Sequence, residues 1–183
     1  MIYTCAELLK KLGSFAKIKA AVKRKEYFKI SYGLYSDKTP CLSELENLFA
    51  RYPNAILTLQ SAFAFYDLSD YVPDKYHVAT SQNAHRIRNE KVEQVYITED
   101  LLNIGKSVIE TEYGFINIYD KERLLIELLR LKNKLPYAYY KEAVNSYREL
   151  AKKKMIDYNK ITEYCSKFNN GNTLKKTIQE IIL

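Results

Sequence analysis

The sequence predicts an α+β fold, with an N-terminal winged helix-turn-helix followed by a domain of mixed strands and a helical bundle. Two short helical patterns separated by a glycine precede two short alternating runs within residues 1–38. Further strand-like runs follow, and at Asp120 the hydrophobic period changes from two to about 3.6 residues. A turn-rich segment at 36–40 separates these parts, so the predicted domains are residues 1–38 and 39–183.

The first helix is predicted from its end signals. Thr4 with Glu7 three residues later matches a capping box, and Gly13 ends the helix because it can adopt positive φ. Ser14 caps a second helix that runs to about residue 25. The predicted apolar stripe of that helix consists of Phe15, Ile18 and Val22. Runs at 27–31 and 33–35 flank Tyr32-Gly33, which is typical of a β-hairpin.

The second part alternates at first and then becomes helical. A helix is predicted at 43–52, a short buried strand or the start of a helix at 55–59, and a core segment at 61–68. Strands are predicted at 76–80, 92–98, 107–111 and 115–119. The last two strands flank Tyr113-Gly114 and form a second predicted hairpin. Helices are then predicted from Asp120 to 131, from Pro136 to about 155, at 157–168 and at 173–183.

Charge is distributed unevenly along the chain. Residues 1–38 carry a net charge of +6, residues 39–131 carry −5 and residues 132–183 carry +6. A dense positive charge on a short helical segment is typical of a surface that binds nucleic acid, although solvated lysine-rich helices give the same pattern. The basic C-terminal part is open to both interpretations.

Helix, glycine turn, basic helix and basic hairpin is the order of a winged helix-turn-helix, in which the second helix enters the major groove. Ser14 would donate to a phosphate, while lysines of the second helix would neutralise phosphates or reach base edges. Lys29 and Tyr32 of the hairpin would lie on the backbone or in the minor groove. The predicted DNA-binding residues are Ser14, Lys17, Lys19, Lys23, Arg24, Lys29 and Tyr32.

Catalytic motifs are missing from the sequence. Cys5, Cys41 and Cys165 form no C-x-x-C pair, and the two histidines, His77 and His85, have no metal-ligand spacing. The acidic residues Asp67, Asp70 and Asp74 resemble part of a metal-dependent nuclease site, but Asn89-Glu90-Lys91 places an asparagine where such a site needs its second carboxylate. We therefore expect no enzyme, no metal and no cofactor. A metal-dependent nuclease or RNA-processing enzyme and a pure protein-interaction module remain alternatives.

Several segments together resemble the AbiEi-type antitoxins, the regulator half of the AbiE abortive-infection toxin–antitoxin system. The resemblance extends over nearly the whole chain, and the segments that carry it are moderately specific only in combination. They are residues 11–18 (KLGSFAKI), 28–36 (FKISYGLYS), 57–68 (LTLQSAFAFYDL) and 118–130 (IYDKERLLIELLR), followed by Glu142-Ala143 and Tyr147.

The resemblance implies an antitoxin of a type IV system that acts in phage defence. Its winged helix would bind inverted repeats in the promoter of its own operon and repress transcription. Its C-terminal domain would neutralise a cognate nucleotidyltransferase-like toxin without a stable complex. For that antitoxin surface we predict Lys132, Lys134, Lys141, Arg148, Lys152, Lys153 and Lys154, because a cationic surface could compete for the polyanion that the toxin handles.

The remaining expectations concern cell location and assembly. No apolar run approaches the ~18 residues that a membrane span requires, and no signal peptide is present, so we expect a cytoplasmic protein that does not bind membranes. No heptad seam indicates a coiled-coil dimer. We expect a monomer of which two copies bind one inverted repeat.

Overall fold

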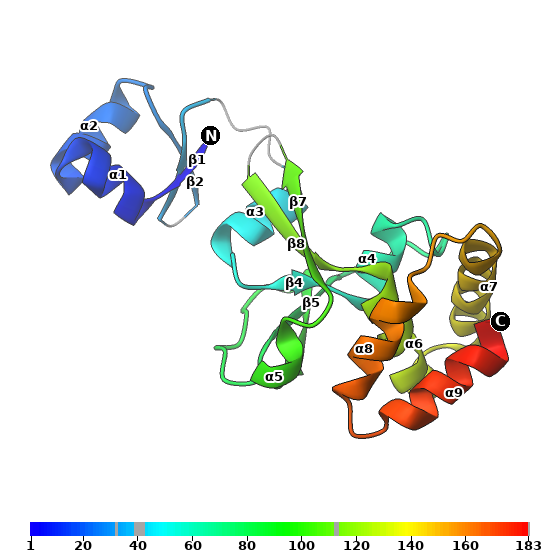
Figure 1. The fold of residues 1–183 in the computed structure, drawn as a ribbon. Helices are drawn as coiled ribbons and strands as arrows, with labels where there is room; N and C mark the ends of the chain where they lie inside the picture. Colours follow the sequence, from blue (N-terminus) through cyan, green and yellow to red (C-terminus); the bar gives the residue numbers. More distant parts are fainter. Residues whose placement is uncertain (32, 39–42, 112–113, 183) are drawn as a thin grey trace. The chain divides into compact units, whose positions relative to one another are not determined.

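The chain folds as two units in the computed structural model, which describes residues 1–31, 33–38, 43–111 and 114–182. Unit 1 consists of Met1–Asn54 with Val108–Ile116, and unit 2 consists of residues 55–107 and 117–183 (Figure 1). Unit 1 thus continues beyond residue 38, where the sequence analysis places its domain boundary. Residues 39 and 40 of the predicted linker lie outside the described residues.

The N-terminal part of unit 1 combines two helices with a small antiparallel sheet. Its elements are β1 (Ile2–Thr4), α1 (Cys5–Leu12), α2 (Phe15–Lys23), β2 (Phe28–Ser31) and β3 (Leu34–Ser36). The strand order is β1-β3-β2, so the first strand pairs with the last. β1 is not predicted from the sequence, because a three-residue strand carries no periodic signal and its partner lies some 30 residues away.

The predicted helix ends of α1 and α2 are confirmed. Thr4 Oγ1 accepts a 3.3 Å hydrogen bond from the Glu7 backbone N–H, and Glu7 Oε2 accepts one of 2.6 Å from the Thr4 N–H. Gly13 ends α1 with φ of 87°, and Ser14 caps α2. The predicted stripe of α2 is wrong at Phe15, which is 61% exposed, because Phe15 lies at the edge of the buried face.

A five-stranded mixed sheet follows, in the order β6-β5-β4-β8-β7. The pairs β4–β8 and β5–β6 are parallel, whereas β4–β5 is antiparallel. Its strands are β4 (Ile56–Leu57), β5 (Tyr76–Ser81), β6 (Val92–Ile97), β7 (Lys106–Thr111) and β8 (Gly114–Tyr119), and the helices along this part of the chain are α3 (Glu44–Arg51), α4 (Leu59–Phe65) and α5 (Glu99–Leu102). The predicted turn residue Tyr113 lies outside the described residues.

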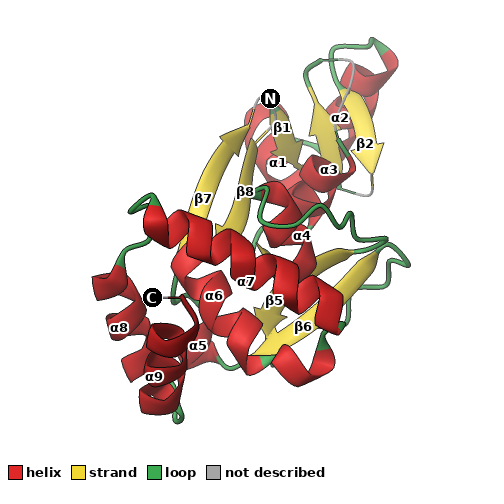
Figure 2. Ribbon diagram, turned by 90° about the vertical axis from the view of Figure 1, so that its right-hand side faces the viewer, coloured by secondary structure: helices red, strands yellow, loops and turns green. Residues whose placement is uncertain are grey.

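The C-terminal part of unit 2 is a helical cluster centred on α6 (Lys121–Arg130), which Asp120 caps as predicted. Almost every residue of α6 is buried, and α4, α7, α8 and α9 all pack against it (Figure 2). The surrounding elements are the 3-10 turn η1 (Lys132–Lys134), α7 (Tyr137–Lys152), α8 (Tyr158–Ser166) and α9 (Gly171–Ile182). The protein therefore has a mixed α+β fold. No helix in the described ranges is both long and apolar enough to cross a membrane.

Candidate nucleic-acid interface

Helix α2 is fixed in place by a small core shared with α1 and the sheet. Leu8, Ile18, Ala21 and Tyr27 are buried together, at no more than 9% exposure. Tyr3, Cys5, Leu9, Leu12, Val22 and Tyr35 pack around them. Because Ile18 and Ala21 point inward, the positions on the opposite side of the helical wheel must point outward. The core of unit 1 thereby decides which face of α2 meets solvent.

The outward face of α2 has small side chains in its middle and lysines along its sides. Lys17, Lys19 and Lys23 are all exposed, and none of their ammonium groups forms an ion pair within the described part of the chain. Ala16 and Ala20 lie one turn apart on the same outward side. Small side chains between cations let a helix approach a polyanion closely. These alanines are not among the residues predicted from the sequence, because that prediction rests on side chains that carry a charge or form hydrogen bonds, although the spacing of four was visible.

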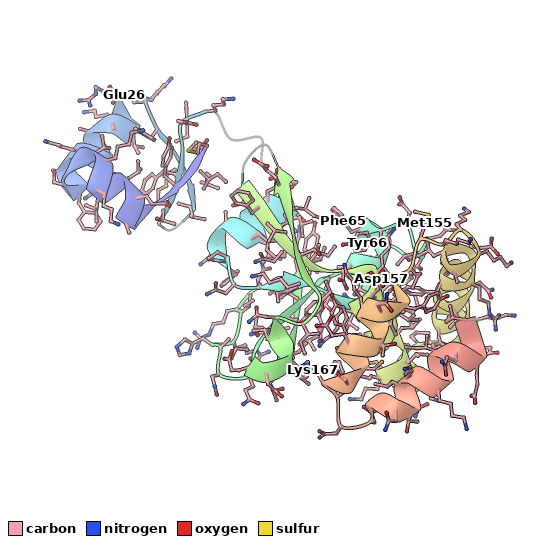
Figure 3. The ribbon with its side chains drawn as sticks, in the orientation of Figure 1. Glu26, Phe65, Tyr66, Met155, Asp157 and Lys167 are labelled. Carbon is pink, nitrogen blue, oxygen red and sulfur yellow. The ribbon has the colours of Figure 1, made fainter. Side chains whose placement is uncertain are left out.

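Arg24 differs from the other predicted DNA-binding cations. Its guanidinium donates two hydrogen bonds to Glu26, from Nε at 2.7 Å and from Nη2 at 3.2 Å. That pairing raises the pKa of Arg24 and lowers the pKa of Glu26. Glu26 lies just past the end of α2 (Figure 3), so part of the predicted cationic surface is neutralised within the chain.

This pairing leads to a testable expectation. Glu26→Gln removes the competing carboxylate, so Arg24 becomes available to a phosphate. We expect the affinity for duplex DNA to rise about fivefold and the slope of log K against log salt to steepen by about 0.9, measured by fluorescence anisotropy. The same substitution in an Arg24→Gln background is the control, and there the gain should vanish. An equal gain in both backgrounds would show that Glu26 acts only through net charge.

Of the two hairpin residues in the predicted site, the structure describes only Lys29. Lys29 on β2 is exposed, but Tyr32 lies outside the described residues. Lys11 of α1 is turned toward the sheet, with its ammonium 4.9 Å from the centre of the Tyr3 ring and 5.6 Å from that of Tyr27. A hydrogen bond with Tyr27 raises the pKa of Lys11. Lys11 is therefore held by aromatic rings and does not extend the cationic face of α2.

The predicted antitoxin cations do not form one compact patch. Lys141, Arg148 and Lys152 share one face of α7, but Lys152 pairs with Glu149 at 2.7 Å and Arg148 donates to the Ile181 carbonyl at 2.8 Å. The remaining predicted residues lie before and after α7, whose sixteen residues span about 24 Å. They are Lys132 and Lys134 in η1, and Lys153 and Lys154 just after α7. All seven side chains are exposed.

The acidic residues considered for metal catalysis are not gathered into a site. Asp67, Asp70 and Asp74 are exposed in the segment between α4 and β5. Among the residues that the structure describes, no group of three or more His, Cys, Asp or Glu side chains could hold a metal ion. Burial lowers the pKa of His77, and its Nδ1 lies 3.4 Å from the Ser61 hydroxyl, which is a contact between β5 and α4.

The strongest cationic surface of unit 1 is therefore the outward face of α2, with Lys29 on β2 nearby in the chain. Comparison with models of protein families finds none that matches this chain, and comparison with curated proteins finds no match.

Proposed function

We propose that this protein is a DNA-binding repressor and antitoxin whose N-terminal winged helix-turn-helix binds the promoter of its own operon. The observation that supports this most is the outward face of α2, where Lys17, Lys19 and Lys23 are exposed and unpaired among the described residues. Uncompensated cations gathered on one short helix are suited to neutralising phosphates.

The diameter of a helix such as α2 suits the major groove. An α-helix with its side chains is about 10–12 Å across, and the groove is about 12 Å wide. In this proposal Ala16 and Ala20 face the base edges, while the lysines reach phosphates on either side. Gly13 makes the turn between α1 and α2, so α1 braces α2 from behind. The β2–β3 hairpin, with Lys29, is the wing and contacts the DNA backbone.

The antitoxin role rests on the family resemblance and is assigned to the C-terminal part of the chain. There the exposed cations from Lys132 to Lys154 would act against a nucleotidyltransferase-like toxin without a stable complex. The protein itself performs no catalysis in this proposal and works in the cytoplasm. Lys132 and Lys134 support the antitoxin surface best, because Arg148 and Lys152 already bond to other groups of the chain.

The test of DNA binding compares two duplexes of equal length. One covers the promoter region of the protein's own operon with its inverted repeat, and the other has the same composition in scrambled order. At about 0.15 M salt we expect the promoter duplex to bind about a thousandfold more tightly, because specific sites exceed non-specific ones by at least that factor. Equal affinities would contradict the proposal, since charge alone binds any duplex.

The same duplexes test the assembly. We expect two protein copies on an intact inverted repeat and one copy after half of the repeat is replaced, measured by native mass spectrometry. A protein that is already dimeric without DNA, or one copy on the full repeat, would rule out the proposed arrangement.

A further inference from the structure

The connection between β5 and β6 has an unusual form. These strands are parallel and in register from Tyr76–Val92 to Ser81–Ile97, so the chain must return along the full length of β5 before β6 begins. It does so in residues 82–91 without a helix, whereas parallel strands normally need a longer, helical crossover. Turns at both ends, Ala84 N–H to Ser81 O and Val92 N–H to Asn89 O, leave only residues 85–88 to cross the sheet. This segment must be extended.

One side chain holds this crossover against the sheet. The Gln94 amide donates to Thr80 Oγ1 at 2.8 Å and to the His85 carbonyl at 3.2 Å, and its oxygen accepts from the Ile87 N–H at 2.8 Å. Ile87 is only 7% exposed. The crossover is therefore anchored by both a buried side chain and backbone hydrogen bonds.

Alternation then determines where the arginines point. In an extended segment successive side chains face opposite ways, so burial of Ile87 turns Arg86 and Arg88 outward, about 7 Å apart. Both are exposed, and neither forms an ion pair or hydrogen bond with the described residues. They lie within the acidic middle of the chain, so the overall positive charge of the protein does not account for them.

An exposed aromatic ring lies on the same face of the sheet. Tyr96 follows Gln94 by two residues on β6, and therefore points to the side that the crossover covers. It is 49% exposed. Four carboxylates lie nearby in the chain. Glu93 is on the opposite face and pairs with Lys75 at 3.6 Å, and Glu99 accepts a hydrogen bond from Ser81. The other two, Glu90 and Asp100, are exposed.

We propose that this crossover face of unit 2 binds single-stranded nucleic acid, with Arg86 and Arg88 on successive phosphates and Tyr96 stacked on a base. Guanidinium groups match phosphate oxygens in a bidentate way, and aromatic rings stack on any base. Because the segment is already ordered, binding costs little conformational entropy. An acidic protein segment would use the arginines but would have no need of the exposed ring. This inference does not depend on the proposed function of α2.

The test uses the full chain with Lys17, Lys19 and Lys23 replaced by alanine, so that α2 cannot supply the binding. Labelled RNA and DNA single strands of about 12 nucleotides, a length within the usual site size, are titrated at several salt concentrations. For Arg86→Ala with Arg88→Ala we expect at least a tenfold loss of affinity and a salt slope shallower by about 1.4, since each phosphate contact contributes about 0.7. For Tyr96→Ala we expect at least a fivefold loss with an unchanged slope.

Lys106→Ala with Lys167→Ala is the matched control, because it removes two exposed charges of unit 2 to which no binding role is assigned. We expect it to change affinity less than twofold. Equal losses in the two double variants would overturn the proposal, as would unchanged binding in Tyr96→Ala. Binding to polyglutamate with no binding to either strand would assign the surface to an acidic protein and also overturn it. Tighter binding of the RNA strand than of the DNA strand would identify RNA as the ligand. Thermal melting checks that each variant is folded.

Discussion

Gly105→Ala is expected to destabilise unit 2 by about 2–5 kcal/mol, which combines the cost of left-handed backbone with that of overpacking a core. Gly105 has φ of +72°, and an added Cβ would stand 2.4 Å from Arg123 Cβ and 3.0 Å from Asp120 Oδ1. Neither neighbour can move away easily. Asp120 caps α6, and it accepts a hydrogen bond from the Tyr164 hydroxyl at 2.8 Å.

Arg123 is held still more firmly than Asp120. It is completely buried, with Nε 3.0 Å from Glu127 Oε1 and Nη1 2.9 Å from the Leu101 carbonyl. Its guanidinium lies 4.8 Å from the ring centres of both Tyr119 and Phe168. Displacing this side chain would disturb a buried charge together with its partner, which is among the most costly changes in a protein core.

Urea unfolding followed by circular dichroism measures this effect, with Gly33→Ala as the matched control. Gly33 has a similar φ of +76°, but an added Cβ would meet no heavy atom within 4 Å. The control should therefore lose only the backbone term, about 1 kcal/mol. For each variant we compare the unfolding transition of the unit in which the substituted glycine lies. A loss at Gly105 no larger than at Gly33 would show that the contact with Arg123 relaxes freely.

Replacement of Lys17, Lys19 and Lys23 by alanine is expected to weaken binding to promoter DNA about a hundredfold. Each lost charge-assisted phosphate contact contributes a factor of about five, and the salt slope should fall by about 2.7 for the three. The proposal that α2 enters the groove depends on this result. Fluorescence anisotropy gives the affinities, and a promoter fusion in cells measures repression.

The matched control removes three exposed lysines from unit 2, namely Lys132, Lys134 and Lys153. We expect this control to repress like the natural protein but to lose protection when the cognate toxin is expressed. The α2 variant should show the reverse, because repression and neutralisation are assigned to different parts of the chain. Normal repression by the α2 variant would refute the assignment of α2 as the reading helix, and unchanged protection by the control would refute the proposed antitoxin surface.

Features that depend on a few neighbouring residues were readable from the sequence. The capping box of Thr4 and Glu7, the turn at Gly13, and the Asp120 cap of α6 all appear in the structure as predicted. Each uses groups at most four residues apart, so their geometry follows from local backbone chemistry. The change of hydrophobic period at Asp120 likewise located the start of the helical cluster.

Features that join distant segments were decided only by the tertiary structure. β1 pairs with β3, Leu57 of β4 lies beside Ile118 of β8, and these partners are separated by too many residues for a periodic pattern to reveal them. The same holds for the crossover arginines, whose outward direction follows from the bonds that Gln94 makes across the sheet. Phe15 is exposed because the core of unit 1 closes on Ile18 and Ala21 instead. By itself the sequence determined where most helices begin and that lysines concentrate near α2. Which charges remain unpaired, and which way they point, depended on packing between residues far apart in the chain.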